Sequence, residues 1–478
     1  MWMKKNARDR MTGALSPVPT QIVSNEEFVP MRQTHDQRHV EYRVNQLAHV
    51  YAKKLGMSRR EFLRSSGGMA TAFIAMNEIF GTAFTVSVAE AMEASAYSER
   101  WPKNQFIFDA QTHHVRDSMP GPLMFRKITA QAGLNPELEG IDPGPDTLHR
   151  ANFLKEIFFD SDTVMALMTG ATIGTNPDHF ALPSDEMVAT RNIFNEAAGS
   201  QRMLSHGLAN PVSRPDYHPL EDAEYQVREY KIDGWKCYTG NPGALWTLDD
   251  EEIAYPFFEK SRELGIRNIS VHKGLPLGKR SEPYVHPGDI PKVARDFPDF
   301  NFIIYHSAMK HMAAAELKPG ESGIGDDGYI AWTTDLCNMR RENPWMTNVY
   351  PELGAVFGHS VITHPELCGH LLGQLIGAFG ADHVIWGTDC IWWGSPQWLI
   401  EAFRRFQIPE QLQERHGYAP ITDRDRELIF GRNLAGIYGV DVDAARTAFP
   451  SDSISKMKAA YLHEGAEPSN TAYGWVVV

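Results

Sequence analysis

Eight short apolar runs, most of them separated by stretches of helical periodicity, recur along the chain from residue 104 onward. The runs are 106–109, 163–169, 203–208, 232–238, 269–272, 302–306, 349–353 and 384–388. Helical patterns include 183–198, 254–264, 290–297 and 365–379. Short strands alternating with helices indicate βαβ units and a parallel sheet. Eight units predict a closed (β/α)8 TIM barrel, an α/β fold. An open doubly wound sheet is the alternative, but no G-x-G-x-x-G follows the first run.

The sequence divides into three parts. We expect a helical N-terminal leader over residues 1–100, the barrel domain over 101–445 and a C-terminal extension over 446–478. In the leader, the string Ser58-Arg59-Arg60-Glu61-Phe62-Leu63 precedes a modest apolar run and resembles a twin-arginine export signal. Ser58 and Glu61 also fit a helix capping box. The protein is therefore expected in the periplasm if the signal operates, and otherwise in the cytoplasm.

Charge and hydropathy restrict the partners. A net charge of -14 argues against nucleic acid, because phosphate binding needs clustered Lys and Arg. No run reaches the roughly 18 uncharged apolar residues of a membrane span, so no integral membrane segment is expected. The four cysteines are scattered without a C-x-x-C pair, which argues against a thiolate zinc site and a disulfide framework. We expect a small-molecule substrate, and assembly as a homodimer is one of the possibilities.

Four of the apolar runs end in residues that can bind a divalent metal. The ends are Asp109-Ala110-Gln111-Thr112-His113, His272, His306 and Asp389. Alternate strand residues share a face, so Asp109, Gln111 and His113 are expected to point the same way. The carboxyl ends of barrel strands carry the chemistry of TIM-barrel enzymes. Three or four nitrogen and oxygen ligands with one open position are typical of a catalytic metal site.

Six pieces of the chain, in order, resemble the amidohydrolase superfamily. The closest similarity is to its amidohydrolase-related branch, which includes aminocarboxymuconate-semialdehyde decarboxylase and related aromatic-acid decarboxylases. The pieces are Asp109-Ala110-Gln111-Thr112-His113, Gly234-Trp235-Lys236-Cys237-Tyr238, Ser270-Val271-His272, Tyr305-His306-Ser307, Trp386-Gly387-Thr388-Asp389 and Ile429-Phe430-Gly431-Arg432-Asn433-Leu434-Ala435. The resemblance spans about 104–440 and implies a TIM barrel with a catalytic metal.

The resemblance also implies roles for individual residues. His113 and His272 would bind the metal through their imidazoles, and Asp389 would bind the metal or hydrogen-bond its water. His306 would act as the base or electrostatic partner beside that water, with direct metal ligation as the second interpretation. One divalent ion is expected: Zn first, with Mn or Fe as alternatives.

Gln111 is where the chain departs from the family pattern, which usually has His-x-His at the first strand. A neutral amide binds a divalent ion weakly, through its oxygen. Several decarboxylases of the branch place Glu at this position, and Gln has the same shape as Glu. Gln111 therefore joins His113, His272 and Asp389 as a candidate metal ligand. The departure leaves the metal affinity open, and a non-catalytic ligand-binding barrel is one of the alternatives.

Three further residues are candidates for substrate binding. Lys236 could bind a substrate carboxylate at the barrel mouth, or it could pair with a neighbouring acid. Trp392 and Trp393 follow Asp389 closely and could form a wall for a flat substrate, or they could pack in the core. The long stretch 308–347 is either a lid or substrate wall, or a partly ordered surface insertion.

The sequence predicts a metal-dependent hydrolase that acts on a C–N or C–O bond of a small organic substrate. A metal lowers the pKa of a water and polarises a carbonyl, while His306 and Asp389 would move the proton. The alternative is a metal-dependent, non-oxidative decarboxylase of an aromatic or unsaturated acid. In that case the metal and Lys236 would hold the substrate carboxylate. The Glu-like shape of Gln111 and the two tryptophans, Trp392 and Trp393, favour this alternative.

Overall fold

The computed structural model describes the chain except residues 27, 132, 134, 144–146, 173, 277–279, 312–323, 326 and 471–472. Seven parallel strands form one sheet in chain order. They are β2 (Phe108–Thr112), β3 (Met165–Met168), β4 (Met203–Ala209), β5 (Gly234–Tyr238), β6 (Asn268–His272), β7 (Asn301–Tyr305) and β8 (Val349–Pro351). Phe302, Ile303 and Ile304 of β7 are fully buried, as expected for a strand covered on both faces.

An irregular segment, 384–390, takes the eighth position and closes the ring. Ile385 pairs in parallel with Glu352, which follows β8, and Cys390 pairs in parallel with Thr112 of β2. The segment thus bonds to both edges of the sheet, and the predicted TIM-barrel α/β fold is confirmed. The predicted strand at 384–388 makes these pairings as single bridges.

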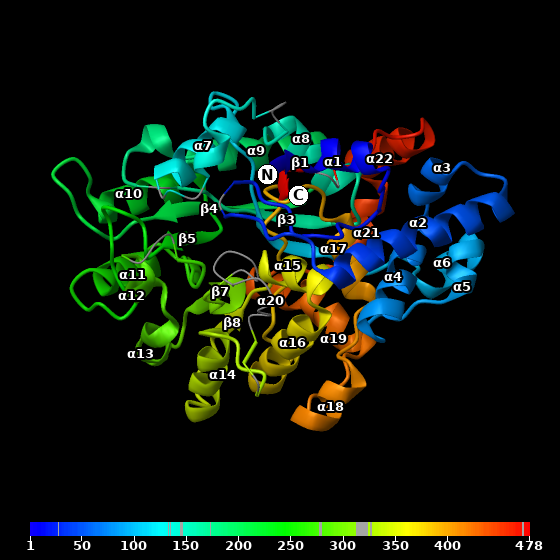
Figure 1. The fold of residues 1–478 in the computed structure, drawn as a ribbon. Helices are drawn as coiled ribbons and strands as arrows, with labels where there is room; N and C mark the ends of the chain where they lie inside the picture. Colours follow the sequence, from blue (N-terminus) through cyan, green and yellow to red (C-terminus); the bar gives the residue numbers. More distant parts are fainter. Residues whose placement is uncertain are drawn as a thin grey trace.

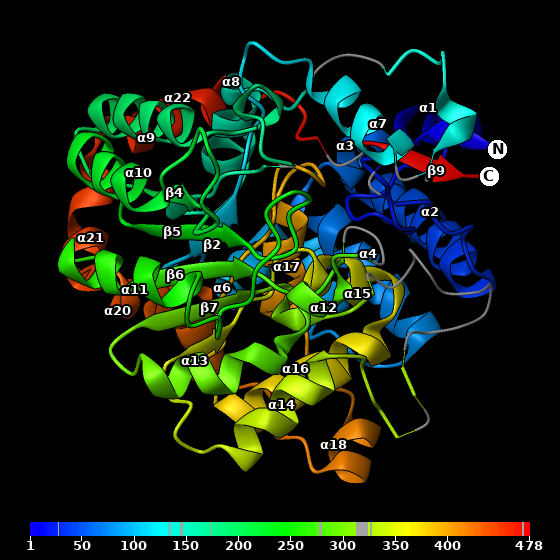
Figure 2. The ribbon, with the colours of Figure 1, turned by 90° about the vertical axis from the view of Figure 1, so that its left-hand side faces the viewer.

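Helices surround the sheet, as Figure 2 shows for the green and yellow part of the chain. The four helices predicted by periodicity are α9 (Ser184–Ala198), α11 (Ala254–Glu263), α13 (Ile290–Asp296) and α16 (Pro365–Phe379). The first strand runs two to three residues later than predicted, because residues 110–113 bond to the closing segment. In the predicted loop 308–347, residues 312–323 and 326 lie outside the described part, and α14 (Thr333–Glu342) occupies part of the rest.

The leader packs against the barrel. It contains α1 (Lys5–Thr12), α2 (His35–Leu55), α3 (Arg59–Leu63), α4 (Ser66–Phe80), α5 (Val88–Met92) and α6 (Ala94–Arg100), and Figure 1 shows the blue helices α2 to α6 grouped beside the barrel. Phe73 of α4 contacts Phe84 with ring centroids 4.8 Å apart, and Phe84 contacts Phe406 at 5.7 Å. Phe406 directly follows α17 (Gln397–Arg405), a helix of the barrel domain. The leader therefore shares its apolar core with the barrel.

The Ser58–Leu63 string begins a helix. The Ser58 hydroxyl accepts the Glu61 N–H at 3.2 Å, and the Glu61 carboxylate accepts the Ser58 N–H at 2.8 Å. This is the predicted capping box. Phe62 is completely buried, so the string is part of the folded unit here. Export through this string stays a prediction.

The two ends of the chain lie together, as the N and C labels of Figure 1 show. Strand β1 (Trp2–Lys4) pairs antiparallel with β9 (Trp475–Val477). The C-terminal extension also contributes α22 (Ser453–His463). All four cysteines are buried free thiols. Among the helices in the described part of the chain, none combines the length and apolar character needed to cross a membrane.

Candidate functional site

Three imidazoles stand at strand ends: His113 after β2, His272 at the end of β6 and His306 after β7, the strand that neighbours β6. One ring nitrogen of each contacts a backbone carbonyl. The nitrogens are His113 Nδ1, His272 Nε2 and His306 Nδ1, and the carbonyls belong to Thr169, Leu275 and Gly354. A carbonyl oxygen can only accept, so each of these nitrogens carries the hydrogen. When such a ring is neutral, its second nitrogen is bare.

The bare nitrogens face other acceptors. His272 Nδ1 lies 3.1 Å from His306 Nε2, and His113 Nε2 lies 2.9 Å from Asp389 Oδ1. Two lone pairs at such distances repel unless a proton or a cation lies between them. Burial lowers the pKa of His272 to about 3 and holds the pKa of His306 well below its usual value. A shared proton is therefore disfavoured between these two rings, and a cation fits.

The donor set fits a divalent metal ion. Zn–N bonds are about 2.0–2.1 Å long, so two nitrogens 3.1 Å apart can touch one ion. Metal-binding histidines normally donate their other N–H to a carbonyl or carboxylate, as these three do. The donors are arranged in two pairs, His272 with His306 and His113 with Asp389, and no three of their ligand atoms lie within 4.8 Å of one another. Within the described residues, the only three His, Cys, Asp or Glu ligand atoms lying within 4.8 Å of one another belong to exposed His35, Asp36 and His39 of α2.

Asp109 fixes the loop that carries Asp389. Its carboxylate accepts the N–H of Thr388 at 3.0 Å and of Gln111 at 3.1 Å, and it accepts the Thr388 hydroxyl as well. Burial raises the pKa of Asp109 to about 7. The Asp389 N–H donates to the Gln111 carbonyl at 2.9 Å, so β2 holds the segment from both sides. Asp109 acts on the site through this loop.

Gln111 is buried, with 2% of its surface exposed. Its Oε1 atom has no hydrogen-bond partner among the described residues. A Cβ added at Gly354 would overlap this oxygen, so the glycine gives it room. The amide oxygen is thus a buried acceptor without a donor among the described residues, and it is free to bind a metal ion.

Glu352 is a site residue that the sequence reasoning missed. It is fully buried, and its carboxyl accepts the His306 N–H at 3.1 Å and the Gly354 N–H at 2.6 Å. Burial, together with the charge of Asp389, raises its pKa well above the usual range. Glu352 positions His306 and the Gly354 carbonyl that orients the His306 ring. One sequence signal could have identified Glu352. It lies at the end of the predicted strand 349–353, just as the candidate metal ligands lie at the ends of theirs.

The space around the Glu352 carboxyl depends on Gly387. A Cβ at this position would overlap Glu352 Oε1. We expect Gly387→Ala to lower the free energy of unfolding by about 1–3 kcal/mol, as overpacking of a buried site does. Urea titration followed by circular dichroism measures the change.

Gly377→Ala is the matched control, since an added Cβ at this position in α16 meets no atom within 4 Å. It should raise stability by up to about 1 kcal/mol, because Ala is favoured over Gly in helices. Equal stabilities of Gly387→Ala and the wild type would contradict the crowding argument.

Lys236 of β5 points its amine into the same buried region. Its Nζ atom has no hydrogen-bond partner among the residues that the structure describes. The amine lies 3.7 Å from the centre of the Tyr305 ring and 4.7 Å from that of Tyr238, within cation–π range. Burial lowers its pKa to about 7, against the charges of Asp389 and Glu352. In the described part of the chain no acid forms an ion pair with it.

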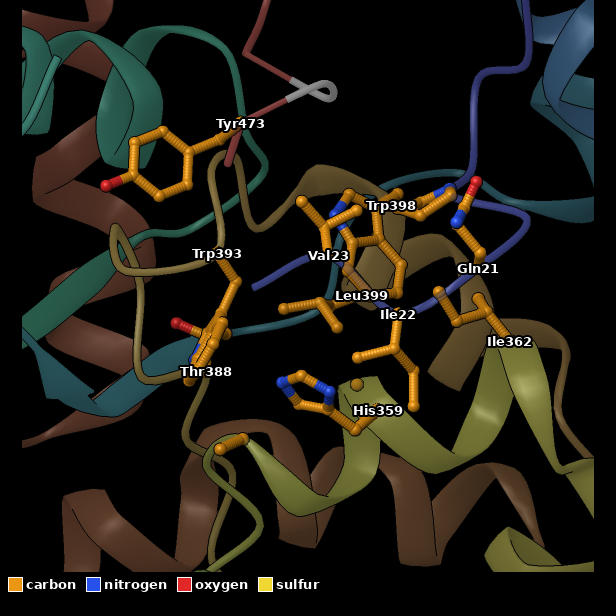
Figure 3. Close-up of a pocket in the computed structure, with 13 residues that line it drawn as sticks. Gln21, Ile22, Val23, His359, Ile362, Thr388, Trp393, Trp398, Leu399 and Tyr473 are labelled. Atoms are coloured by element: carbon orange, nitrogen blue, oxygen red, sulfur yellow. The ribbon is translucent and has the colours of Figure 1, made fainter. Parts of the chain in front are cut away.

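The two tryptophans face different ways. Trp392 stacks on the His113 ring, with centroids 5.1 Å apart and planes at 11°. Trp393 contacts His359 at 4.6 Å instead and lines a separate cavity (Figure 3). Of the two predicted substrate walls, the structure thus brings Trp392 beside a candidate ligand and places Trp393 in the separate cavity.

Comparison with known proteins gives a family. A family model described as amidohydrolase matches residues 159–440, which is more than half of the chain and includes every barrel strand but the first. A comparison with curated proteins finds no match.

Three solved structures illustrate the similarity of this chain to known folds, all at low sequence identity. An uncharacterised TIM-barrel protein from Bordetella bronchiseptica is 15% identical, with 71% of this chain and 100% of that chain covered and a TM-score of 0.43. A 4-oxalomesaconate hydratase from Rhodopseudomonas palustris is 14% identical, with 72% and 98% covered and a TM-score of 0.41. A 5-carboxyvanillate decarboxylase from Novosphingobium aromaticivorans, complexed with manganese, is 10% identical, with 71% and 97% covered and a TM-score of 0.43.

Proposed function

The chain belongs to the amidohydrolase family, and from this premise we propose that it is a metal-dependent hydrolase acting on a small organic substrate. The bond cleaved would be a C–N or C–O bond next to a carbonyl, as in an amide or a lactone. The protein is an enzyme of the hydrolase or carboxy-lyase kind that this family contains.

One observation carries the proposal. Each of the three site imidazoles gives its N–H to a backbone carbonyl and turns a bare nitrogen toward another acceptor. We assign His113, His272 and Asp389 to one divalent ion, with Gln111 offering its amide oxygen. His306 joins them, because its bare Nε2 faces the bare nitrogen of His272. Zn is our first choice, with Mn or Fe as alternatives for the same donors.

When bound, such an ion lowers the pKa of a water and polarises a carbonyl. Asp389 is placed to take the proton, since one of its oxygens lies beside His113 and its loop is fixed by Asp109. His306 is held by two contacts, through its ring to Gly354 and through its N–H to Glu352. Trp392 covers the His113 ring and keeps water from that side of it.

Decarboxylation of an aromatic or unsaturated acid is the second candidate. The observation in its favour is Lys236, a fully buried amine without a hydrogen-bond partner among the described residues. A buried cation of this kind needs an anion to offset its loss of solvent. A substrate carboxylate would provide that anion. Lys236 and the metal would then hold the acid while the C–C bond breaks.

A substrate panel separates the two reactions. The full chain, loaded with Zn or with Mn, is incubated with lactones, amides and aromatic acids, while NMR follows hydrolysis and a gas assay follows carbon dioxide. Hydrolysis without carbon dioxide supports the main proposal, and carbon dioxide without hydrolysis supports the second. Lys236→Met should raise the KM of an acid substrate by roughly 10- to 100-fold, the value of one hydrogen bond to a charged group. Full metal loading without either reaction would point to a ligand-binding barrel.

Periplasmic location, should the twin-arginine string act as a signal, and assembly as a homodimer stay predictions of the sequence.

A further inference from the structure

The segment that carries Asp389 continues into a turn over residues 391–394. Both Trp392 and Trp393 lie in this turn, and its first carbonyl accepts the N–H of its fourth residue at 3.1 Å. Trp392 stacks on His113, one of the proposed metal ligands, with ring centroids 5.1 Å apart. The two central residues of a hydrogen-bonded turn have defined backbone angles. A contact that holds Trp393 therefore also holds Trp392 and the segment before it.

Phe28 of the leader makes such a contact. Its ring centroid lies 5.9 Å from that of Trp393 and 5.5 Å from that of His359 in α15 (Val356–Thr363). Figure 3 shows Trp393 and His359 beside each other, with Ile22 and Val23 of the leader lining the same small cavity. Phe28 is 2% exposed, and aromatic pairs at these distances add to the stabilisation that burial provides. The leader thus packs directly on the turn.

The leader segment around Phe28 is itself anchored to other parts of the chain. Ser24 exchanges two backbone hydrogen bonds with Trp475 of β9, at 2.9 and 2.7 Å, and its hydroxyl donates to the Phe28 carbonyl. The buried carboxylate of Glu26 accepts two hydrogen bonds, at 2.8 and 3.0 Å, from Arg126, which follows the first strand of the barrel. Phe28 is therefore fixed both to the C-terminal strand and to the barrel, as a support must be.

The C-terminal extension holds the same turn at its other end. The Asn470 carbonyl accepts the Ser395 N–H at 3.0 Å, and a Cβ added at Gly394 would overlap this carbonyl. The Asn470 N–H in turn donates to the carboxylate of Glu156 at 3.1 Å, and Glu156 is 1% exposed. The turn at 391–394 therefore lies against residues from both ends of the chain.

We infer that the leader and the C-terminal extension belong to the catalytic unit, where they hold the Asp389 segment, and that Phe28 is a positioning residue for the metal site. The inference rests on the assignment of His113 and Asp389 to the metal in the proposed function. Phe28 acts on the ligands only through the two tryptophans. The leader lies outside the matched residues 159–440, so the matched domain alone is not the whole catalytic unit. An enzyme cleaved to remove residues 1–100 would lack this support.

Metal affinity of the full-length protein, measured by competition with a chelator for Zn, tests the inference. Residues that hold metal ligands without touching the metal typically contribute 10- to 100-fold to affinity, so Phe28→Ala should weaken Zn binding by about that factor. Phe28→Leu refills most of the lost volume and should restore most of the affinity. All proteins in this comparison contain His35→Ala and His39→Ala, which remove the exposed ligand cluster of α2.

Phe84→Ala is the matched control. Phe84 is a leader phenylalanine that is as buried as Phe28, but it packs on Phe73 and Phe406. Its loss should leave Zn affinity unchanged, even if the variant is less stable. Wild-type Zn affinity in Phe28→Ala would overturn the inference. An equal loss of affinity in both alanine variants would also overturn it, because it would indicate general loosening of the fold.

Amide hydrogen exchange of the metal-free protein tests the support of the segment without the metal. The N–H groups of Asp389, Gly394 and Ser395 donate to backbone carbonyls, so they exchange only when the segment opens. Phe28→Ala should speed exchange across 389–395, and Phe84→Ala should not. Unchanged exchange in Phe28→Ala would overturn the inference whatever the metal content. Faster exchange, in a protein whose wild type binds no metal, would support the hold on the segment and refute the metal assignment instead.

Discussion

His272→Ala is expected to remove the divalent metal from the purified protein. The variant deletes one bare nitrogen of the His272–His306 pair, in which the two atoms lie 3.1 Å apart. Loss of residues that only support a metal ligand typically weakens binding 10- to 100-fold, so loss of a ligand should cost at least about 100-fold. Elemental analysis should find about one ion per chain in a reference protein with an intact His272, and almost none in the variant. The catalytic activity should disappear together with the metal.

The possible metal-binding cluster on the surface of α2 must be removed in this experiment. His35, Asp36 and His39 present three ligand atoms within 4.8 Å and could collect metal from the buffer. The reference protein and the variant should therefore both contain His35→Ala and His39→Ala.

His114→Ala is the matched control for a buried imidazole. The His114 ring bonds to the Thr190 hydroxyl at 2.8 Å and to the Val115 carbonyl, away from the paired donors. The metal content of the His114→Ala variant should match that of the reference protein, even if the variant is less stable. Full retention of metal by His272→Ala would refute the ligand assignment.

Arg405→Met should destabilise the whole protein. Arg405 is completely buried in α17, and its guanidinium lies 3.2 Å from Glu90 of the leader and 3.4 Å from Glu401. It also lies over the rings of Trp101 and Phe73. Removal of one partner from a buried ion pair typically costs about 3–5 kcal/mol, because the other charge stays buried without compensation. Urea unfolding should show this loss as a lower midpoint of the transition.

Arg43→Met is the matched control. Arg43 pairs with Glu78 on two leader helices, and both side chains are exposed. Exposed pairs contribute about 0–1 kcal/mol, so this variant should stay close to the wild type. A large effect at Arg405 with a small effect at Arg43 is the result expected if the leader and the barrel unfold as one unit. A change of less than about 1 kcal/mol at Arg405 would contradict that view.

Local sequence signals predict the structure where short-range physics decides it. Apolar runs predicted seven of the strands, because strands covered on both faces are apolar throughout. Helical periodicity predicted the four named helices, because burial on one face leaves its period in the chain. The capping box of Ser58 and Glu61 also followed from four adjacent residues. The eighth run was expected to be a regular strand, whereas the segment 384–390 has one bridge residue against each neighbouring strand.

The site required contacts between distant parts of the chain. Glu352 was missed because nothing in its own segment indicates that its carboxyl accepts a hydrogen bond from the N–H of His306. The different surroundings of Trp392 and Trp393 depend on His113 and on His359, which are distant in the sequence. The tautomers of the three histidines were equally hidden, because the carbonyls that fix them lie in other segments or in a loop.

The sequence by itself determined the order of strands and helices and placed metal-binding residue types at the strand ends. Both follow from chain-local properties, namely side-chain polarity and the period of burial. Only the tertiary structure decided which nitrogens are bare, which acids are structural and that the leader shares the barrel's core. Those outcomes depend on hydrogen-bond partners and packing surfaces that meet only after the chain has folded.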